Sequence, residues 1–217
     1  MASQAAWQES MRSVTIGTAL PAQALNSLFS FKHIRYAVLR RTGIDDYMLE
    51  RLAKAWPMLE HLTLEDNPTL VQAPVQAATL HSLVSFSKYT FHLSYLELRL
   101  DAGEIPPFID GSKTSQAALA AEETPSRKRL LLKVDMFSYI GDPAGVAEFL
   151  LSLFPRVALC VPNHTSFPSE RFRWTRAAQI IAERLEAPPL VAGSSANAQN
   201  SALTCLIYLF PLRMMLN

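Results

Sequence analysis

A short apolar pattern recurs along this chain, and each copy follows a segment with helical periodicity. The clearest copies read L-x-x-L-x-L, at residues 59–64 and 93–98, with a constant offset of 34 positions between them. An earlier and weaker copy spans residues 34–39. Short apolar ladders of this kind predict strands, and recurrence at about 20 to 50 residues predicts stacked supersecondary units.

The segments between the ladders predict amphipathic helices. The best example spans residues 45–56, with Asp45 as the expected N-cap and Pro57 directly after its end. Further helices are expected at 22–29, 80–89, 144–154 and 172–187, and further strands at 13–16, 33–40, 130–134 and 157–161. The pattern of the last helix places five apolar residues on one side, which is the side expected to pack: Trp174, Ala177, Ala178, Ile181 and Leu185.

This alternation predicts an α/β fold. We expect an irregular leucine-rich-repeat-like solenoid of four or five units, with parallel strands on the concave side and helices on the convex side. The repeat domain is placed at residues 1–187 with an exposed insertion at about 101–128, and residues 188–217 form a linker and an apolar tail. A doubly wound α/β enzyme or small-molecule-binding domain also alternates strands and helices, and is the alternative hypothesis.

Composition and charge narrow the classes of partner. The formal net charge is +1 over 217 residues, which gives no reason to expect nucleic acid or an anionic membrane as partner. The apolar run near the C-terminus is interrupted by Pro211 and Arg213 and is too short to span a bilayer, so no membrane partner is expected. The N-terminus lacks the pattern of a secretory signal, and we expect an intracellular protein, cytoplasmic or nuclear.

Residue patterns typical of catalysis are missing from the sequence. The five histidines are scattered, and Cys160 and Cys205 are too far apart for a clustered metal site. No glycine-rich phosphate loop and no G-x-S-x-G motif occurs. We therefore expect no catalytic residues, no cofactor and no metal, and we expect Cys160 to be buried in an apolar strand.

The residues between the leucines of each strand form a candidate binding surface. Successive side chains of a strand point to opposite faces of the sheet, so these residues line the face opposite the helices. Neighbouring strands lie about 4.8 Å apart, which arranges the side chains as a grid of aromatic and charged groups, as at protein-binding sites. The grid comprises Tyr36, Val38, Arg40, His61, Thr63, Glu65, Tyr95, Glu97, Arg99, Leu131, Lys133 and Asp135. It predicts a non-catalytic surface that recognises a protein partner or substrate.

Three stretches resemble the leucine-rich-repeat region of fungal F-box-type proteins. They are residues 44–64, which end in Pro-x-Leu-x-x-Leu-x-Leu, and residues 93–98 and 142–155. The resemblance covers about residues 30–185 and implies substrate recognition for a cullin-based ubiquitin ligase. An F-box, which would dock the ligase adaptor as a second partner, is not evident in the first thirty residues.

Overall fold

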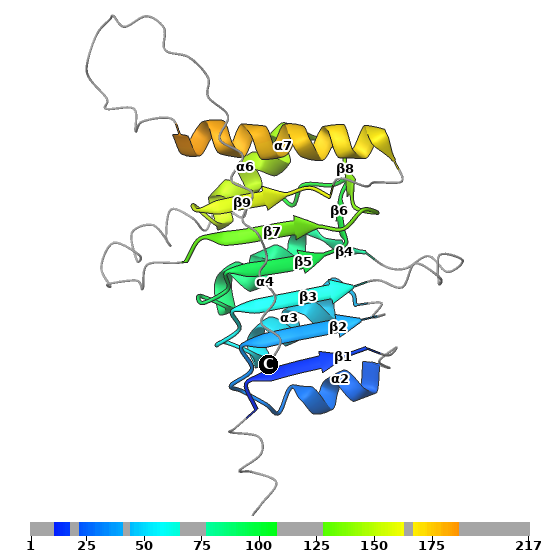
Figure 1. The fold of residues 1–217 in the computed structure, drawn as a ribbon, viewed down its shortest axis with the longest axis vertical. Coiled ribbons are helices and arrows are strands. Elements are labelled where there is room, and N and C mark those ends of the chain that lie inside the picture. The colour runs from blue at the N-terminus through cyan, green and yellow to red at the C-terminus, as the bar shows by residue number, and fades with distance from the viewer. Residues whose placement is uncertain are drawn as a thin grey trace, which may run out of the picture. The chain divides into compact units, whose positions relative to one another are not determined.

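The computed structural model describes residues 11–17, 22–40, 44–65, 77–107, 128–162 and 167–186. These residues form an α/β fold, as the sequence predicts, with parallel strands in a main sheet and helices packed against it (Figure 1). The predicted tail at 188–217 and most of the predicted insertion lie outside the described residues.

The main sheet has six parallel strands that neighbour one another in chain order. They are β1 (Ser13–Ile16), β2 (Tyr36–Arg40), β3 (His61–Glu65), β5 (Tyr95–Leu98), β7 (Leu130–Val134) and β9 (Val157–Cys160). Each of the four further strands predicted at 13–16, 33–40, 130–134 and 157–161, and each of the two clear ladders, contains one of these strands. The sheet order therefore never reverses within the described part of the chain.

The described helices are α2 (Ala22–Leu28), α3 (Asp46–Ala55), α4 (Leu80–Tyr89), α6 (Pro143–Leu153) and α7 (Pro168–Glu186), and the middle three cover one face of the main sheet. Figure 1 shows α3, α4 and α6 behind the strands, while α7 lies across the β9 end, where it packs on α6 and β9. The last helix begins at Pro168, four residues earlier than the sequence predicts, because Pro168 suits a first helical turn.

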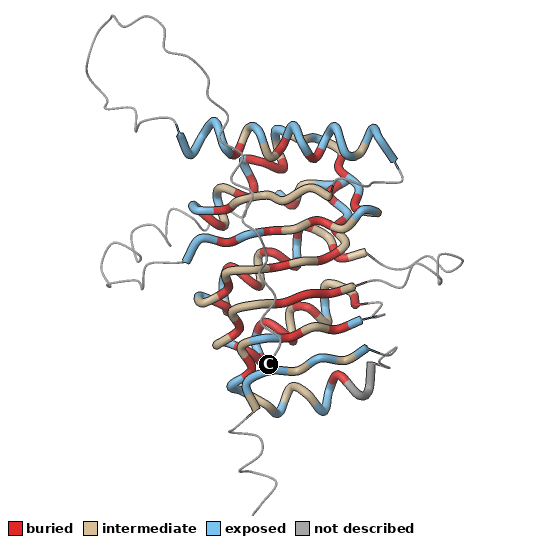
Figure 2. Tube along the Cα trace, viewed as in Figure 1, coloured by how far each residue is buried: buried red, intermediate tan, exposed pale blue. Residues whose placement is uncertain are grey.

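The leucines of the ladders point toward the helices, as predicted. All six are buried in one apolar core with the inward faces of the helices (Figure 2): Leu59, Leu62, Leu64, Leu93, Leu96 and Leu98. In α7, Trp174, Ala177 and Ile181 are buried, but Leu185 is 43% exposed, which corrects its predicted inward position. Leu185 lies in the last turn of the helix, near the end of the described residues.

Three helices end in nearly the same backbone conformation. Trp56, Thr90 and Phe154 have φ between −132° and −119° and ψ between 67° and 87°. Each donates its backbone N–H to the carbonyl four residues earlier, which closes the helix before the chain turns into the next strand. Pro57 and Pro155 follow two of these caps and Phe91 follows the third, so the turn does not depend on proline.

Backbone carbonyls next to the strands join successive units. The carbonyl of Arg35 accepts the N–H groups of Glu60 and His61, at 2.8 and 2.9 Å. The carbonyl of Glu60 in turn accepts those of Ser94 and Tyr95, at 2.9 and 3.1 Å. Because the same contact recurs from one unit to the next, the strands are held in one common register.

Side chains also tie neighbouring helices together. Asp45 caps α3 as predicted, because its Oδ1 accepts the N–H of Met48 at 2.8 Å. Asp46 has a different role: its carboxylate accepts the backbone N–H and the hydroxyl of Thr79, at 2.7 and 2.5 Å. Thr79 is itself the N-cap of α4, so one carboxylate links the starts of two successive helices.

A second, smaller parallel sheet was not predicted from the sequence. It consists of β4 (Ala78–Thr79), β6 (Leu100–Ala102) and β8 (Tyr139–Ile140). Strand β6 includes Asp101 and Ala102, which the sequence predicted as part of the exposed insertion at about 101–128. Two side chains of α7 form hydrogen bonds with the backbone of Ile140. The N–H of Ile140 donates to the carboxylate of Glu170, and the carbonyl of Ile140 accepts from the guanidinium of Arg173, both at 3.1 Å.

None of the helices in the described part of the chain has the length and apolar character needed to cross a membrane. The longest, α7, carries charged residues along its whole length. Its buried positions are spaced as on an amphipathic helix that packs on one side against the protein.

We expect leucine-to-aspartate substitutions on the two faces of the sheet to differ in their effect on stability. Leu62→Asp places an unpaired carboxylate in the core and is expected to lower the free energy of unfolding by about 4 kcal/mol or more. Leu131→Asp, on the other face of β7, is expected to cost less than about 1 kcal/mol. Urea denaturation followed by circular dichroism measures both, and equal losses would contradict this assignment of faces.

Candidate functional site

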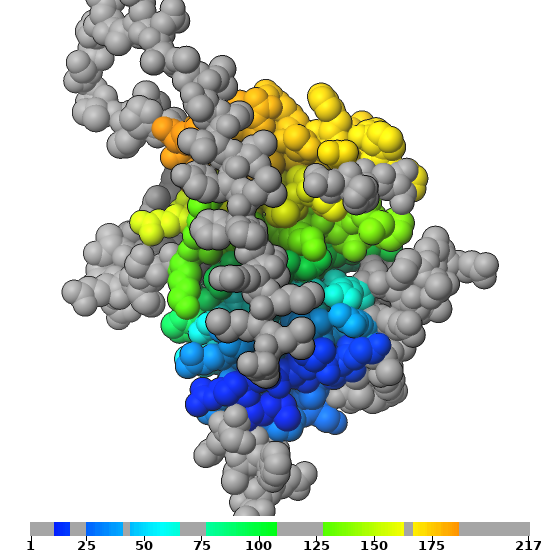
Figure 3. Space-filling view, in the orientation of Figure 1, coloured from blue at the N-terminus to red at the C-terminus, as the bar shows by residue number. Residues whose placement is uncertain are grey.

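The face of the main sheet opposite the helices carries most of the predicted site residues. Figure 3 shows the side chains of the strands as successive bands in chain order on this side of the molecule. The parallel register places Tyr36 beside His61, His61 beside Tyr95, and Tyr95 beside Leu131. Two residues further along the strands, Thr63 lies beside Glu97 and Glu97 beside Lys133, so the face is ordered in rows.

The first row is built from aromatic rings. His61 and Tyr95 are stacked, with ring centroids 4.2 Å apart and an angle of 3° between the ring planes. Tyr36 lies on the other side of His61, with centroids 6.3 Å apart and a tilt of 35°. Tyr36 is 49% exposed, and Leu131 continues the row as an exposed apolar residue. We call Tyr36, His61, Tyr95 and Leu131 the aromatic row.

The second row is charged but internally paired. The Nζ of Lys133 lies 2.6 Å from Glu97 Oε1, and the hydroxyl of Tyr95 donates to Glu97 Oε2 at 2.7 Å. The sequence predicted Thr63 as part of the open surface, but Thr63 is only 5% exposed. Its hydroxyl lies 3.2 Å from His61 Nε2. Thr63 therefore contacts the aromatic row through His61 and offers almost no surface of its own to a partner.

The remaining predicted residues lie toward the ends of the strands. Arg40 and Glu65 are neighbours in register and form an ion pair of 2.8 Å. Asp135 follows β7 and accepts the N–H of Phe137 at 2.9 Å, and the guanidinium of Arg99 lies 5.8 Å from the centre of the Phe137 ring. Asp135 and Arg99 therefore contribute to the same turn beyond the sheet, and the structure does not bring them into the rows.

One residue of this surface was not predicted. Glu60 precedes β3, and its carboxylate lies 3.3 Å from Arg35, 3.3 Å from the hydroxyl of Tyr36 and 3.9 Å from Lys128. It holds Tyr36 at the margin of the aromatic row. The local sequence gives no signal for this role, because the partners Arg35, Tyr36 and Lys128 lie far from Glu60 along the chain.

Two ionisable groups of the aromatic row have shifted pKa values. Partial burial lowers the pKa of His61 below its usual value, and the nearby carboxylate of Glu97 opposes this shift. Burial also raises the pKa of Tyr95, and its hydrogen bond to Glu97 and the charge of that carboxylate raise it further. Both shifts favour the neutral forms of these two side chains.

The described residues offer no arrangement that would hold a metal. No three or more histidine, cysteine, aspartate or glutamate side chains come together among them as a metal-ion site would require. Cys160 lies beside Lys133 in register and is half-buried, which corrects the prediction that it is buried. The reason is its place on the open face, where alternation along β9 puts it.

Comparison with known proteins assigns neither a family nor an activity to the chain. No protein-family model matches the chain, and no curated protein matches it. Among solved structures, the chain is similar to the tropomodulin C-terminal domain of Caenorhabditis elegans, with 15% sequence identity and a TM-score of 0.34 over 81% of this chain and 87% of that chain. A likeness of that size assigns neither a family nor an activity.

The lowered pKa of His61 has a defined consequence for stability. Because the folded protein binds the His61 proton less readily than the unfolded chain does, unfolding takes up a proton once the pH falls below about 6.5. The contribution of His61 is thus complete above its unfolded pKa and decreases as the pH falls from there toward the lowered folded pKa.

Glu97→Gln tests this electrostatic arrangement. Loss of the carboxylate removes the contact that raises the pKa of His61 and leaves Lys133 without its partner, so the pKa of His61 is expected to fall further. Titration of the His61 ring by NMR measures the change. Glu65→Gln is the control and is expected to shift the pKa of His61 less, and a rise in the Glu97→Gln variant would contradict the assignment.

Proposed function

We propose that the chain is a non-catalytic protein-recognition module that binds a protein partner through the open face of its main sheet. The observation that carries the proposal is the aromatic row, which crosses four neighbouring strands without a charged member. Aromatic side chains at the centre of a surface, with charged groups around them, are the arrangement found at protein-binding sites.

The charges beside the row support a partner with an uncharged contact segment. Arg40 is paired with Glu65 and Lys133 with Glu97, so each charge has an opposite neighbour. A partner that separated such a pair would have to replace the lost attraction while desolvating both groups. A partner that places aromatic or aliphatic side chains on the aromatic row avoids this cost, because the ion pairs remain intact at the edge of the contact.

We further propose that the units form an irregular leucine-rich-repeat-like solenoid, with the strands on its concave side. Supporting observations are the unbroken strand order, the repeated helix ends and the carbonyl contacts that recur between units. A doubly wound sheet binds its ligand where the strand order reverses, and the described strands contain no such reversal.

The role of substrate receptor in a cullin-based ubiquitin ligase is a narrower form of the same proposal. It rests on the resemblance of residues 44–64, 93–98 and 142–155 to F-box-type repeat regions. Recovery of a cullin adaptor with the purified complex would support it. Stable partners without any adaptor would leave general protein recognition and remove the ligase role.

A pair of exposed tyrosines tests which face binds. Tyr36→Ala removes one end of the aromatic row and is expected to weaken partner binding about fivefold to tenfold, since aromatic anchors at interfaces cost more than 1 kcal/mol when truncated. Tyr47→Ala is the matched control, because Tyr47 is 65% exposed but belongs to α3 on the helical side. Affinity capture with quantitative mass spectrometry compares both variants with the unmodified chain.

The comparison of the two tyrosine variants can contradict the proposal. If Tyr47→Ala releases the captured proteins and Tyr36→Ala does not, the binding surface lies on the helices and the proposal for the sheet face is wrong. Melting curves of both variants control for unfolding, and both are expected to lie close to that of the unmodified chain because each side chain is exposed.

A further inference from the structure

We propose that the outer side of the first turns of α7 is a second interaction surface, which binds an acidic protein segment that carries an apolar side chain. This surface belongs to the helix at the β9 end and shares no residue with the aromatic row. The proposal therefore does not depend on recognition by the sheet face.

The inward side of α7 is fully used in packing. Trp174 is buried and donates its indole N–H to the carbonyl of Ser138 at 3.1 Å, while Ala177 and Ile181 continue the buried stripe. Glu170 and Arg173 are engaged with the backbone of Ile140. These contacts fix the helix in place and determine which side chains remain for the outside.

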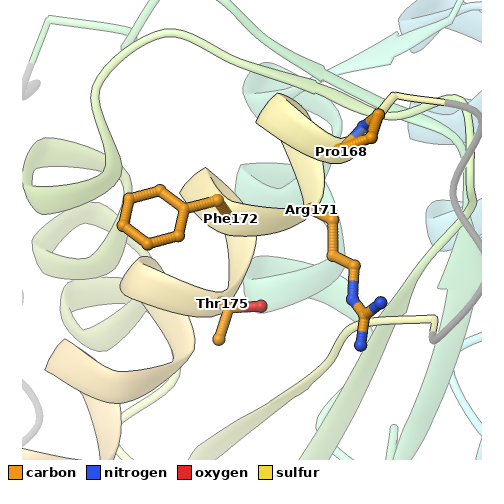
Figure 4. A pocket seen from close by; sticks show the side chains of 4 residues that line it. All are labelled: Pro168, Arg171, Phe172 and Thr175. Atoms are coloured by element: carbon orange, nitrogen blue, oxygen red, sulfur yellow. The ribbon is translucent and has the colours of Figure 1, made fainter.

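The outer side contains a shallow depression of about 400 Å³. Its lining residues are three or four positions apart along α7, which places them on one side of the helix: Pro168, Arg171, Phe172 and Thr175 (Figure 4). Figure 4 shows Arg171 and Phe172 projecting in different directions from the helix, with Thr175 one turn further along. A bound segment would thus meet an aromatic ring and a guanidinium at separate points.

Phe172 provides the apolar part of this surface. Its side chain is 74% exposed, the highest value among the exposed large apolar residues of the described chain. Single exposed apolar residues are common and need no explanation. Here the ring borders a depression next to a guanidinium, and this combination is the composition enriched at protein interfaces.

The charged residues at the start of α7 are mostly positive. Residues 167–178 contain three arginines, Arg171, Arg173 and Arg176, and one acidic residue, Glu170. Glu170 is directed to Ile140, whereas Arg171 and Arg176 are exposed and form no ion pair with another described residue. In contrast to Arg40 and Lys133 on the sheet face, which are paired with Glu65 and Glu97, these guanidinium groups favour a carboxylate-rich segment.

Fluorescence anisotropy with short labelled peptides tests the proposal on the full chain. The probe has a central Leu-Phe pair flanked by glutamates. One comparison peptide has lysines in place of the glutamates, another has serines in place of the Leu-Phe pair, and a short single-stranded DNA represents a polyanion without apolar side chains. We expect the acidic Leu-Phe peptide to bind most tightly. Equal or tighter binding of the lysine peptide or of the DNA would overturn the proposal, as would no binding of the probe at millimolar concentration.

Matched substitutions on α7 locate the contact. Arg171→Glu is expected to weaken probe binding about fivefold, whereas Arg184→Glu, an equal change of charge near the other end of α7, should have little effect because Arg184 is paired with Glu148 at the exposed surface. Phe172→Ala is expected to weaken binding about tenfold, and Leu185→Ala should leave it unchanged. Equal effects within either pair would show unspecific attraction and overturn the proposal.

A variant of the sheet face separates this surface from the first. Tyr36→Ala is expected to leave binding of the acidic probe unchanged, and a loss of probe binding in that variant would assign the probe to the sheet and overturn the inference for α7. Circular dichroism melting curves show whether each variant is folded. Because Phe172, Arg171, Arg184 and Leu185 are all exposed, all four variants are expected to fold.

Discussion

The fold of the described residues depends on the burial of the ladder leucines between the parallel strands and the helices. Leu62 and Leu96 lie beside each other on neighbouring strands and are fully buried, which requires the strands to keep this register. The carbonyl groups of Arg35 and Glu60 fix that register by each accepting two N–H groups from the following unit. The positions of the residues on the open face follow from this constraint.

The two surfaces proposed as binding sites arise from different physical situations. On the sheet, the register forces unlike charges to meet across strands, as in the pair of Lys133 and Glu97, and leaves the uncharged rings of the neighbouring row as the available contact area. On α7, packing directs Glu170 inward and leaves Arg171 outside with Phe172. The first surface suits an uncharged contact segment and the second an acidic one, so the two would select different segments of partners.

The sequence predicted the elements whose pattern is long enough to show a period. The main strands, four of the five helices and the cap at Asp45 were placed within a few residues, because apolar spacing alone determines which side is buried. The sheet of β4, β6 and β8 was missed, since strands of two or three residues show no alternation. Contacts between units were also beyond reach: nothing in the local sequence indicates that Asp46 binds Thr79, that Glu60 holds Tyr36, or that Thr63 is covered by its neighbours.

The common register also separates two kinds of evolutionary change. Between β5 and β7 the chain takes 31 residues, from 99 to 129, and between β2 and β3 it takes 20, from 41 to 60, yet both pairs of strands align in parallel. Insertions and deletions in the connections can thus be absorbed without disturbing the sheet. Deleting Leu62 inside β3 would instead bring Thr63 to the core position and Leu64 to the surface, because the side chains of a strand alternate. The connections between strands can therefore vary in length, whereas the strands themselves cannot.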